Sequence, residues 1–207
     1  MIKDKVALTR EEEKTLINRY LVDEIFNAAK VEGIPTTYLD TENLVNNDIN
    51  PNLDDYNLSK LKNLKDAYKC LLDDSFLSKE ISLETLQYLN LIVNGRSIVA
   101  HPGELRTDDV LIHGTTYKPP LPDPYVIKNY IIDTVQKEES KTLLALHLYC
   151  YIMRVQPFID GNKRTGNLFA NFILAKYGLG LVSVPSNKRR TFFSLLIKYY
   201  ESNDDTK

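Results

Sequence analysis

The sequence predicts a mainly α-helical domain, and three observations lead to this fold class. Apolar residues recur every three to four positions along most of the chain, which is the spacing of one face of an α-helix. Capping residues precede these segments, and Gly or Pro follows several of them. Only residues 96–122 depart from this rhythm. With 207 residues, of which 43% are hydrophobic, the chain is long enough for one domain with a substantial core.

The first predicted helix begins at Thr9. Thr9 and Glu12 have the Thr-x-x-Glu form of a capping box, and apolar residues follow at helical spacing as far as Ala28. Gly33 suits a left-handed helix cap, and Pro35 cannot continue the helix. We therefore expect this helix to end at Gly33.

Two further helices are predicted before the irregular interval. Leucines and a tyrosine recur at helical spacing over residues 58–72, and leucines recur again over residues 83–93. Ser82 is the expected N-cap of the second of these helices, and Asn94-Gly95 is its expected end. Both helices should face the core.

The irregular interval is predicted to contain a short β-hairpin. Residues 110–112 and 115–117 are rich in strand-forming side chains, and they flank the turn candidate His113-Gly114. Pro119 and Pro120 should end the hairpin.

Helices resume after the hairpin. Asp123 is a candidate cap followed by Pro124 at the first helical position. Ser140 can cap the next helix, which should end before Pro157. The last two helices are predicted over residues 162–177 and 187–200, with Ser186 as the cap of the second.

Composition excludes several classes of function. The 26 basic and 28 acidic side chains give a formal charge of -2, so no field over the whole chain attracts nucleic acid or an anionic membrane. No stretch reaches the roughly 18 apolar residues of a membrane span, and the N-terminus lacks an apolar signal core. The two cysteines form no metal-binding motif. We expect a cytoplasmic protein without nucleic-acid or membrane partners.

The chemistry is concentrated in a polar loop, QPFIDGNKRTGN at residues 156–167, which lies between two apolar helices. Gly161 permits a tight turn, and Asn162 then opens a helix whose free N–H groups can bind an anion. Lys163 and Arg164 add positive charge, and Asp160 supplies the hard carboxylate oxygen that magnesium on a phosphate requires. These residues suggest a nucleotide triphosphate site. On spacing alone, an ordinary turn with solvated charges is an equal alternative.

This loop resembles the loop of the Fic family, usually written His-Pro-Phe-x-Asp-Gly-Asn-Gly-Arg-x-x-Arg. The segment Pro102-Gly-Glu-Leu-Arg106 and the hairpin after it are similar to the family's proline-glycine-x-x-arginine segment and flap. The resemblance implies a Fic core over residues 55–202, which binds ATP with Mg²⁺ and transfers AMP to a hydroxyl side chain of a protein target. That target could be the chain itself, and a homo-oligomer is also possible.

The resemblance also implies a role for each matching residue. Asp160 would bind magnesium and, with Asn162 and Arg164, serve catalysis. The flap would hold a target segment by strand-like pairing. The nucleotide-binding residues implied are Gly161, Asn162, Lys163, Arg164 and Asn167, and the flap residues are Ile112, His113, Gly114 and Thr115.

Two of the positions that depart from the family pattern bear directly on its chemistry. Gln156 stands where the family has its catalytic histidine, and a carboxamide cannot accept a proton as an imidazole does. Asn167 stands where the family has a second arginine. Three alternatives therefore stay open. They are an impaired adenylyltransferase, a catalytically inactive nucleotide- or protein-binding module, and a phosphotransferase like the death-on-curing toxins, which the chain resembles in Gly-Asn-Lys-Arg-Thr.

Residues 28–35 resemble the inhibitory segment that some Fic proteins carry at the N-terminus. The resemblance makes Glu32 the candidate inhibitor, although its usual arginine partner is replaced by Asn167. Glu32 could bond Arg164 or the Asn167 amide instead, or it could be a solvated residue of the last helical turn. The expected division is an inhibitory-helix segment at 1–54 packed on the core, the core at 55–202 and a polar tail at 203–207.

Overall fold

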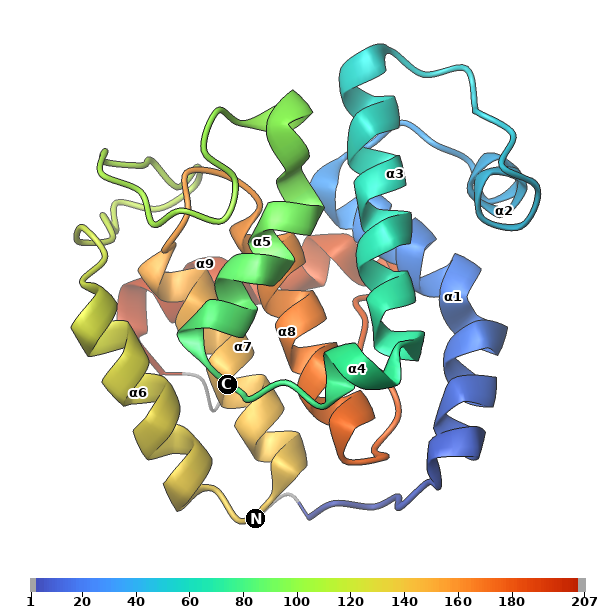
Figure 1. Cartoon of the computed structure of the whole chain (residues 1–207). Coiled ribbons are helices and arrows are strands. Elements are labelled where there is room, and N and C mark those ends of the chain that lie inside the picture. Colours follow the sequence, from blue (N-terminus) through green and yellow to red (C-terminus); the bar gives the residue numbers. More distant parts are fainter. Residues whose placement is uncertain (1–2, 205–207) are drawn as a thin grey trace.

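The computed structural model describes residues 3–204, so the two N-terminal residues and residues 205–207 of the predicted tail lie outside the described residues. Helix α8 runs through the middle of the molecule, and the other helices surround it (Figure 1). The longer helices are α1 (Arg10–Glu32), α2 (Tyr38–Asn47), α3 (Asp55–Lys69), α5 (Leu83–Ile98), α6 (Pro124–Lys137), α7 (Lys141–Val155), α8 (Asn162–Lys176) and α9 (Arg189–Ser202). The short ones are η1 (Cys70–Leu72), α4 (Asp74–Leu77) and η2 (Ser186–Lys188).

The predicted helical class is confirmed, and its organising element is α8. Every residue from Arg164 to Ala175 is buried, as in a helix that other helices cover on all sides. It packs on α7 and α5 and touches α1 and α3. The rings of Phe169, Phe172 and Phe76 pack together in the core around it. The loop that opens α8 is therefore attached to the most constrained helix of the fold.

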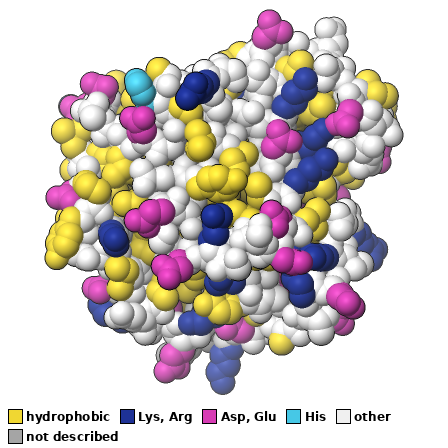
Figure 2. All heavy atoms as spheres, viewed as in Figure 1, with side chains coloured by type: hydrophobic (Ala, Val, Ile, Leu, Met, Phe, Trp, Pro, Cys, Tyr) yellow, Lys and Arg dark blue, Asp and Glu magenta, His cyan; other side chains and the backbone are white. Residues whose placement is uncertain are grey.

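The surface agrees with the near-neutral composition. In the view of Figure 2, basic, acidic and apolar side chains are interspersed. Among residues 3–204, no helix is both long and apolar enough to cross a membrane.

Several helix ends follow the capping chemistry of the sequence. Thr9 and Glu12 form both bonds of the predicted capping box, and Gly33 ends α1 in the left-handed conformation, with φ 77°. Helix α2 was not predicted, although Thr37 and Asp40 form a second capping box at its start. Its apolar face is too short to produce a clear periodic signal.

The regular helix that begins at Leu83 is interrupted at the predicted end Asn94-Gly95, because Gly95 has a non-helical backbone (φ 58°, ψ 171°), and one more turn follows within α5. Asn63 of α3 donates a hydrogen bond to the Asn94 carbonyl at 2.7 Å, which satisfies an acceptor that the kink exposes. Ser186 begins the 3₁₀ turn η2 rather than capping α9, whose first turn has no side-chain cap.

The predicted β-hairpin was also wrong, since residues 3–204 contain no β-strand. A turn does form at His113 and Gly114, but the chain on either side stays unpaired. The nearby carbonyls of Asp108 and Pro120 instead accept hydrogen bonds from Arg106, and proline supplies no N–H for a ladder. We keep the name flap for this irregular segment, residues 107–120.

The segment before α1 is tied to the far side of the helical bundle. The Asp4 carboxylate accepts hydrogen bonds from the backbone N–H groups of Lys141 and Thr142, at 3.0 and 2.8 Å, at the start of α7. Hydrogen bonding by the Thr142 side chain first, and then by the Thr142 and Lys141 backbones, holds the pKa of Asp4 well below its usual range. The Leu8 N–H donates to the Gly178 carbonyl at 2.8 Å. Helix α1 is thus anchored at its N-terminal end.

Candidate functional site

The polar loop between α7 and α8 is bracketed by two residues in the left-handed conformation. Gln156 ends α7 with φ 48° and ψ 60°, and Gly161 precedes α8 with φ 78°. A Cβ on Gly161 would lie 2.8 Å from the Asn94 side-chain oxygen, so the close approach to α5 requires glycine. Gly161 provides no side-chain cap, which leaves the first turn of α8 without a protein side-chain acceptor at that position.

Asn162 shapes the loop from within. Its Oδ1 accepts from the Phe158 N–H at 2.9 Å, and its Nδ2 donates to the Phe158 carbonyl at 2.8 Å. The same amide nitrogen donates to Gln156 Oε1 at 3.0 Å. Phe158 is buried beneath the loop. The side chain of Asn162 therefore holds the loop in its turn.

Both ends of the Gln156 amide are engaged inside the protein. Its Oε1 accepts from Asn162, and its Nε2 donates to the Met153 carbonyl and lies 3.5 Å from the Tyr200 hydroxyl. Burial raises the pKa of Tyr200 above its usual value, so this hydroxyl stays protonated at neutral pH. Neither side chain is a proton acceptor in this arrangement.

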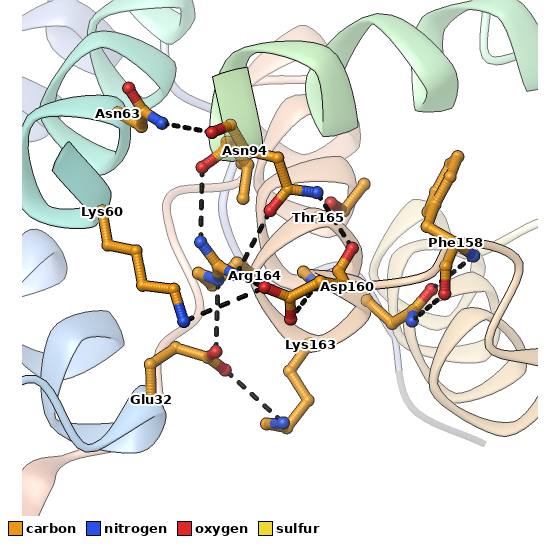
Figure 3. A network of polar contacts seen from close by, with 12 residues as sticks. Glu32, Lys60, Asn63, Asn94, Phe158, Asp160, Lys163, Arg164 and Thr165 are labelled. Carbon is orange, nitrogen blue, oxygen red and sulfur yellow. Dashed lines mark hydrogen bonds and ion pairs between the residues drawn. The ribbon is translucent and has the colours of Figure 1, made fainter. Parts of the chain in front are cut away.

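Asp160 presents its carboxylate at the mouth of the loop, as Figure 3 shows. Its Oδ1 accepts from the Gly161 N–H at 2.6 Å, and its Oδ2 lies 3.1 Å from Arg164 Nη2 and 3.8 Å from Lys60 Nζ. The side chain remains 36% exposed. Asn90 and Asn94 of α5 donate to its backbone carbonyl and fix its position.

This carboxylate fits a magnesium ion held together with a substrate phosphate. Within residues 3–204 there is no group of three or more His, Cys, Asp or Glu side chains that could hold a metal by themselves. Magnesium commonly binds through one or two carboxylates, with phosphate oxygens and water completing its shell. Asp160 offers one hard, partly exposed oxygen donor beside two basic side chains, Arg164 of α8 and Lys60 of α3.

Glu32 closes the same region from the end of α1 (Figure 3). Its Oε2 lies 3.2 Å from Arg164 Nε, and its Oε1 lies 3.6 Å from Lys163 Nζ. The Glu32 and Arg164 side chains are only 8% and 1% exposed. Neither Glu32 Oε1 nor Arg164 Nε has an aligned hydrogen bond, so the contact is chiefly electrostatic. Of the open alternatives for Glu32, the structure shows the contact with Arg164.

Asn167 is directed away from these charges. Its Oδ1 accepts from the Tyr68 hydroxyl at 2.7 Å, and its Nδ2 donates to the Val182 carbonyl at 3.1 Å. It lines a cavity of about 20 Å³ together with Glu32 and Arg164 but forms no hydrogen bond to either. The amide belongs to a buried network between α8, α3 and the segment before α9.

The flap lies beside the loop across a hollow of about 240 Å³. Ile112 and His113 line this hollow together with Gln156, Lys163 and Tyr200. Gly114 forms the flap turn with φ 89°, and the Thr115 hydroxyl accepts from the Tyr117 N–H. The structure thus brings the predicted flap to the loop without the predicted strand pairing.

Arg106 joins the flap to the loop, a role that the sequence did not reveal. Its Nε donates to the Gln156 carbonyl at 2.7 Å, and its Nη atoms donate to the carbonyls of Asp108, Pro119 and Pro120. The residue is only 5% exposed. One buried guanidinium therefore connects both ends of the flap to the residue at the head of the loop.

Sequence reasoning also missed Lys60, Asn90 and Asn94. They come from α3 and α5, more than 60 residues before the loop, and only tertiary packing brings them to Asp160. No local motif marks them. Lys60 is one of four lysines of α3, so its residue type did not distinguish it, and Asn90 and Asn94 stood out only as polar residues in the apolar helix α5.

Comparison with known proteins gives one consistent result. Residues 80–174 match the model of the Fic/DOC family. The chain is 29% identical over 140 residues to "Protein adenylyltransferase fic-1" of Caenorhabditis elegans, covering 63% of this chain and 27% of that protein. It is 25% identical over 180 residues to "Protein adenylyltransferase Fic" of Drosophila willistoni, covering 83% and 35%. The chain thus spans about a third of the length of these relatives.

Solved structures agree on the fold. A Fic-domain-containing signaling protein from Bacteroides thetaiotaomicron superposes with a TM-score of 0.74 at 20% identity, over 91% of this chain and 75% of that one. Fic-1 from Caenorhabditis elegans gives 0.74 at 22% identity, over 90% and 58%. The family match over residues 80–174, the named relatives and the folds therefore agree in their similarity to the Fic/DOC family.

Proposed function

We propose that the chain transfers AMP from ATP to a hydroxyl group of a protein, as a Fic-type protein adenylyltransferase. The observation that carries this proposal is that Lys163 and Arg164 both contact the carboxylate of Glu32, while Arg164 also contacts Asp160. A site that holds an internal carboxylate between two cations is suited to an anionic ligand. The names of the relatives, which are protein adenylyltransferases, support the kind of anion.

In this proposal the loop holds the triphosphate. Asp160 binds Mg²⁺, and Lys163 and Arg164 hold phosphate oxygens after Glu32 has moved aside. Gly161 and Asn162 position the N–H groups at the start of α8 toward the phosphates. Asn167 contributes through the fold, because its amide is already bonded to Tyr68 and Val182. The metal would supply charge neutralisation at the phosphates.

The reaction is a substitution at the α-phosphorus. The target hydroxyl oxygen forms a bond to that phosphorus, the bond from the α-phosphorus to the bridging oxygen breaks, and pyrophosphate leaves. The hydroxyl proton passes to water, because Gln156 cannot accept it. Loss of a general base typically lowers the rate by about 10²–10⁴-fold, so we expect slow transfer by the unaltered chain.

Glu32 restrains this site in the proposal. Residues 1–54 form the inhibitory segment, and residues 55–202 form the core on which it acts. The ion pairs of Glu32 with Lys163 and Arg164 support this, because they use the cations that a triphosphate would need. The flap supports a protein target, since residues 107–113 are free of ladder pairing and can pair with an extended segment.

One observation favours a second candidate, a nucleotide-binding module without turnover. Gln156 is bonded at both ends, and Asn167 belongs to a buried network, so the two departures from the family pattern are integrated into the fold. This is the arrangement expected of a site that has become structural.

Labelled ATP separates these functions. The Glu32→Gly variant is incubated with the chain itself and with a cell extract, using ATP labelled at the α- or the γ-phosphate. Label from the α-position alone supports AMP transfer, and label from the γ-position alone supports phosphotransfer. No label on protein, with ATP binding measured by calorimetry, supports the binding module. Arg164→Ala is the matched control, because it removes the cation in contact with Glu32 and should abolish binding and labelling together.

A further inference from the structure

Lys60 reaches the site from α3, outside the residues that match the family (Figure 3). Its Nζ lies 3.8 Å from Asp160 Oδ2, on the oxygen that also contacts Arg164. The same ammonium lies 4.3 Å from the centre of the Tyr56 ring. A lysine side chain thus stands against the carboxylate to which we assign the metal.

The burial of Lys60 makes this contact specific. Its side chain is 12% exposed, although lysines usually leave their ammonium in water. Removing a cation from water is costly unless an anion compensates it, and Asp160 is the carboxylate with which it forms an ion pair. Lys65, one turn further along α3, pairs instead with Asp48. Lys60 is therefore held by the loop.

We propose that Lys60 is an internal cation at the metal-binding face of Asp160, and that it competes with a divalent cation for the Oδ2 atom. The reason is that one carboxylate can compensate only a limited amount of positive charge. Oδ1 is bonded to the Gly161 N–H, and Oδ2 already faces the two cations Arg164 and Lys60. A divalent ion on Oδ2 would be repelled by both.

Arg164 and Lys60 differ in how readily each can move away from Asp160. Arg164 is 1% exposed and is also bonded to Asn94 and to the Val93 carbonyl, so it is fixed. Lys60 has a flexible four-carbon stem and a longer contact with Asp160. Metal binding therefore displaces Lys60, and the freed ammonium can move to a phosphate oxygen. This second step rests on the proposed function, whereas the competition at Asp160 does not.

Manganese binding tests the competition without nucleotide. Free Mn²⁺ is measured by electron paramagnetic resonance during titration of the full chain, of Lys60→Met and of Lys60→Arg. Lys62→Met is the matched control, two residues away on the same helix. We expect Lys60→Met to bind Mn²⁺ at least about 10-fold more tightly than the unaltered chain, with Lys60→Arg and Lys62→Met unchanged. The added binding should disappear in Lys60→Met/Asp160→Asn.

Equal Mn²⁺ affinity in Lys60→Met and the unaltered chain, or no Mn²⁺ binding by either, would overturn the proposal. Circular dichroism confirms that the variants are folded, and Lys60→Gln is the second neutral variant, with the same expected gain, if Lys60→Met does not fold.

A nucleotide arm tests the second step. In the Glu32→Gly background, ATP affinity is measured with Mg²⁺ and with a chelator. The measured quantity is the dissociation constant with the chelator divided by the dissociation constant with Mg²⁺. Lys60→Met should raise this ratio at least about 10-fold relative to Lys62→Met, because Lys60 partly replaces the metal at the phosphates. An unchanged ratio would overturn this step. If ATP does not bind to any variant while the Mn²⁺ result holds, the proposed function fails and the competition at Asp160 stands.

Discussion

Replacing Glu32 by Gln tests the proposed restraint most directly. The substitution keeps the size of the side chain and removes its charge, which lies 3.2 Å from Arg164 and 3.6 Å from Lys163. Glu32→Gly would also remove the charge, but it would place a second glycine beside Gly33 and weaken the end of α1 by about 1 kcal/mol. Gln is therefore the cleaner change.

Two opposing magnitudes follow from the geometry. A phosphate charge about 4 Å from the Glu32 carboxylate is opposed by about 4 kcal/mol at an effective dielectric constant of about 20, which corresponds to roughly 10³-fold in affinity. In the unaltered chain the Glu32 side chain can also move aside when ATP binds, which makes the difference in affinity smaller. We therefore expect Glu32→Gln to bind ATP about 10- to 10³-fold more tightly than the unaltered chain. The fold should lose about 3 kcal/mol, the low end for a broken buried pair, because Arg164 keeps its bonds to Asp160 and Asn94.

Isothermal titration with ATP and Mg²⁺ measures the gain, and urea unfolding measures the loss. Glu11→Gln, an exposed residue in the first turn of the same helix, is the control and should change neither quantity. An ATP affinity of folded Glu32→Gln within twofold of the unaltered chain would refute the reasoning and leave Glu32 a structural residue.

Three further outcomes are expected. Gln156→His in the Glu32→Gly background should raise AMP transfer at least about 10²-fold in a labelling assay, because histidine tolerates the left-handed backbone at this position and supplies a base. Unchanged labelling despite ATP binding would contradict the adenylyltransferase proposal. Glu24 is buried, and desolvation raises its pKa to about 7, so the chain should lose stability as the pH rises from about 4.5 to 7. Glu24→Gln should remove this loss in urea titrations, with a gain of up to about 3 kcal/mol at pH 8 and almost none at pH 4; equal gains at both pH values would contradict it. In Arg106→Met, limited proteolysis should cleave residues 107–118 at least about 10-fold faster than in the unaltered chain. Arg106→Lys should not restore protection, because one ammonium cannot reach carbonyls on both ends of the flap. An unchanged cleavage rate would show that Arg106 does not hold the flap.

The parts of the molecule that the sequence predicted are those built from neighbouring residues. The capping box at Thr9, the left-handed end at Gly33 and the turn at Gly161 each depend on a few consecutive side chains. The bonds of Asp160 to Gly161 and Arg164, and of Asn162 to Gln156, also join residues of one loop and one helical turn. Local chemistry was sufficient for the capping box, the helix end and the turn, and these three predictions are confirmed.

The rest depended on packing between distant segments. The strand-forming residues on either side of His113 favoured a hairpin, but Arg106 and the prolines engage the flap carbonyls and leave no ladder. Lys60 and Asn94 reach Asp160 through the docking of α3 and α5 on α8, which no local pattern specifies. The partner of Glu32 was open in the sequence, because either Arg164 or Asn167 could have faced it.

The anchoring of α1 at its N-terminal end has a consequence for kinetics. When the contact of Glu32 opens, Asp4 and Leu8 still hold the other end of the helix. In the proposed scheme the carboxylate then behaves as a tethered ligand, whose local concentration depends on the length and stiffness of α1 rather than on the amount of protein. The nucleotide concentration that half-fills the site should consequently be independent of dilution, and each molecule should close again by a unimolecular step after the nucleotide leaves.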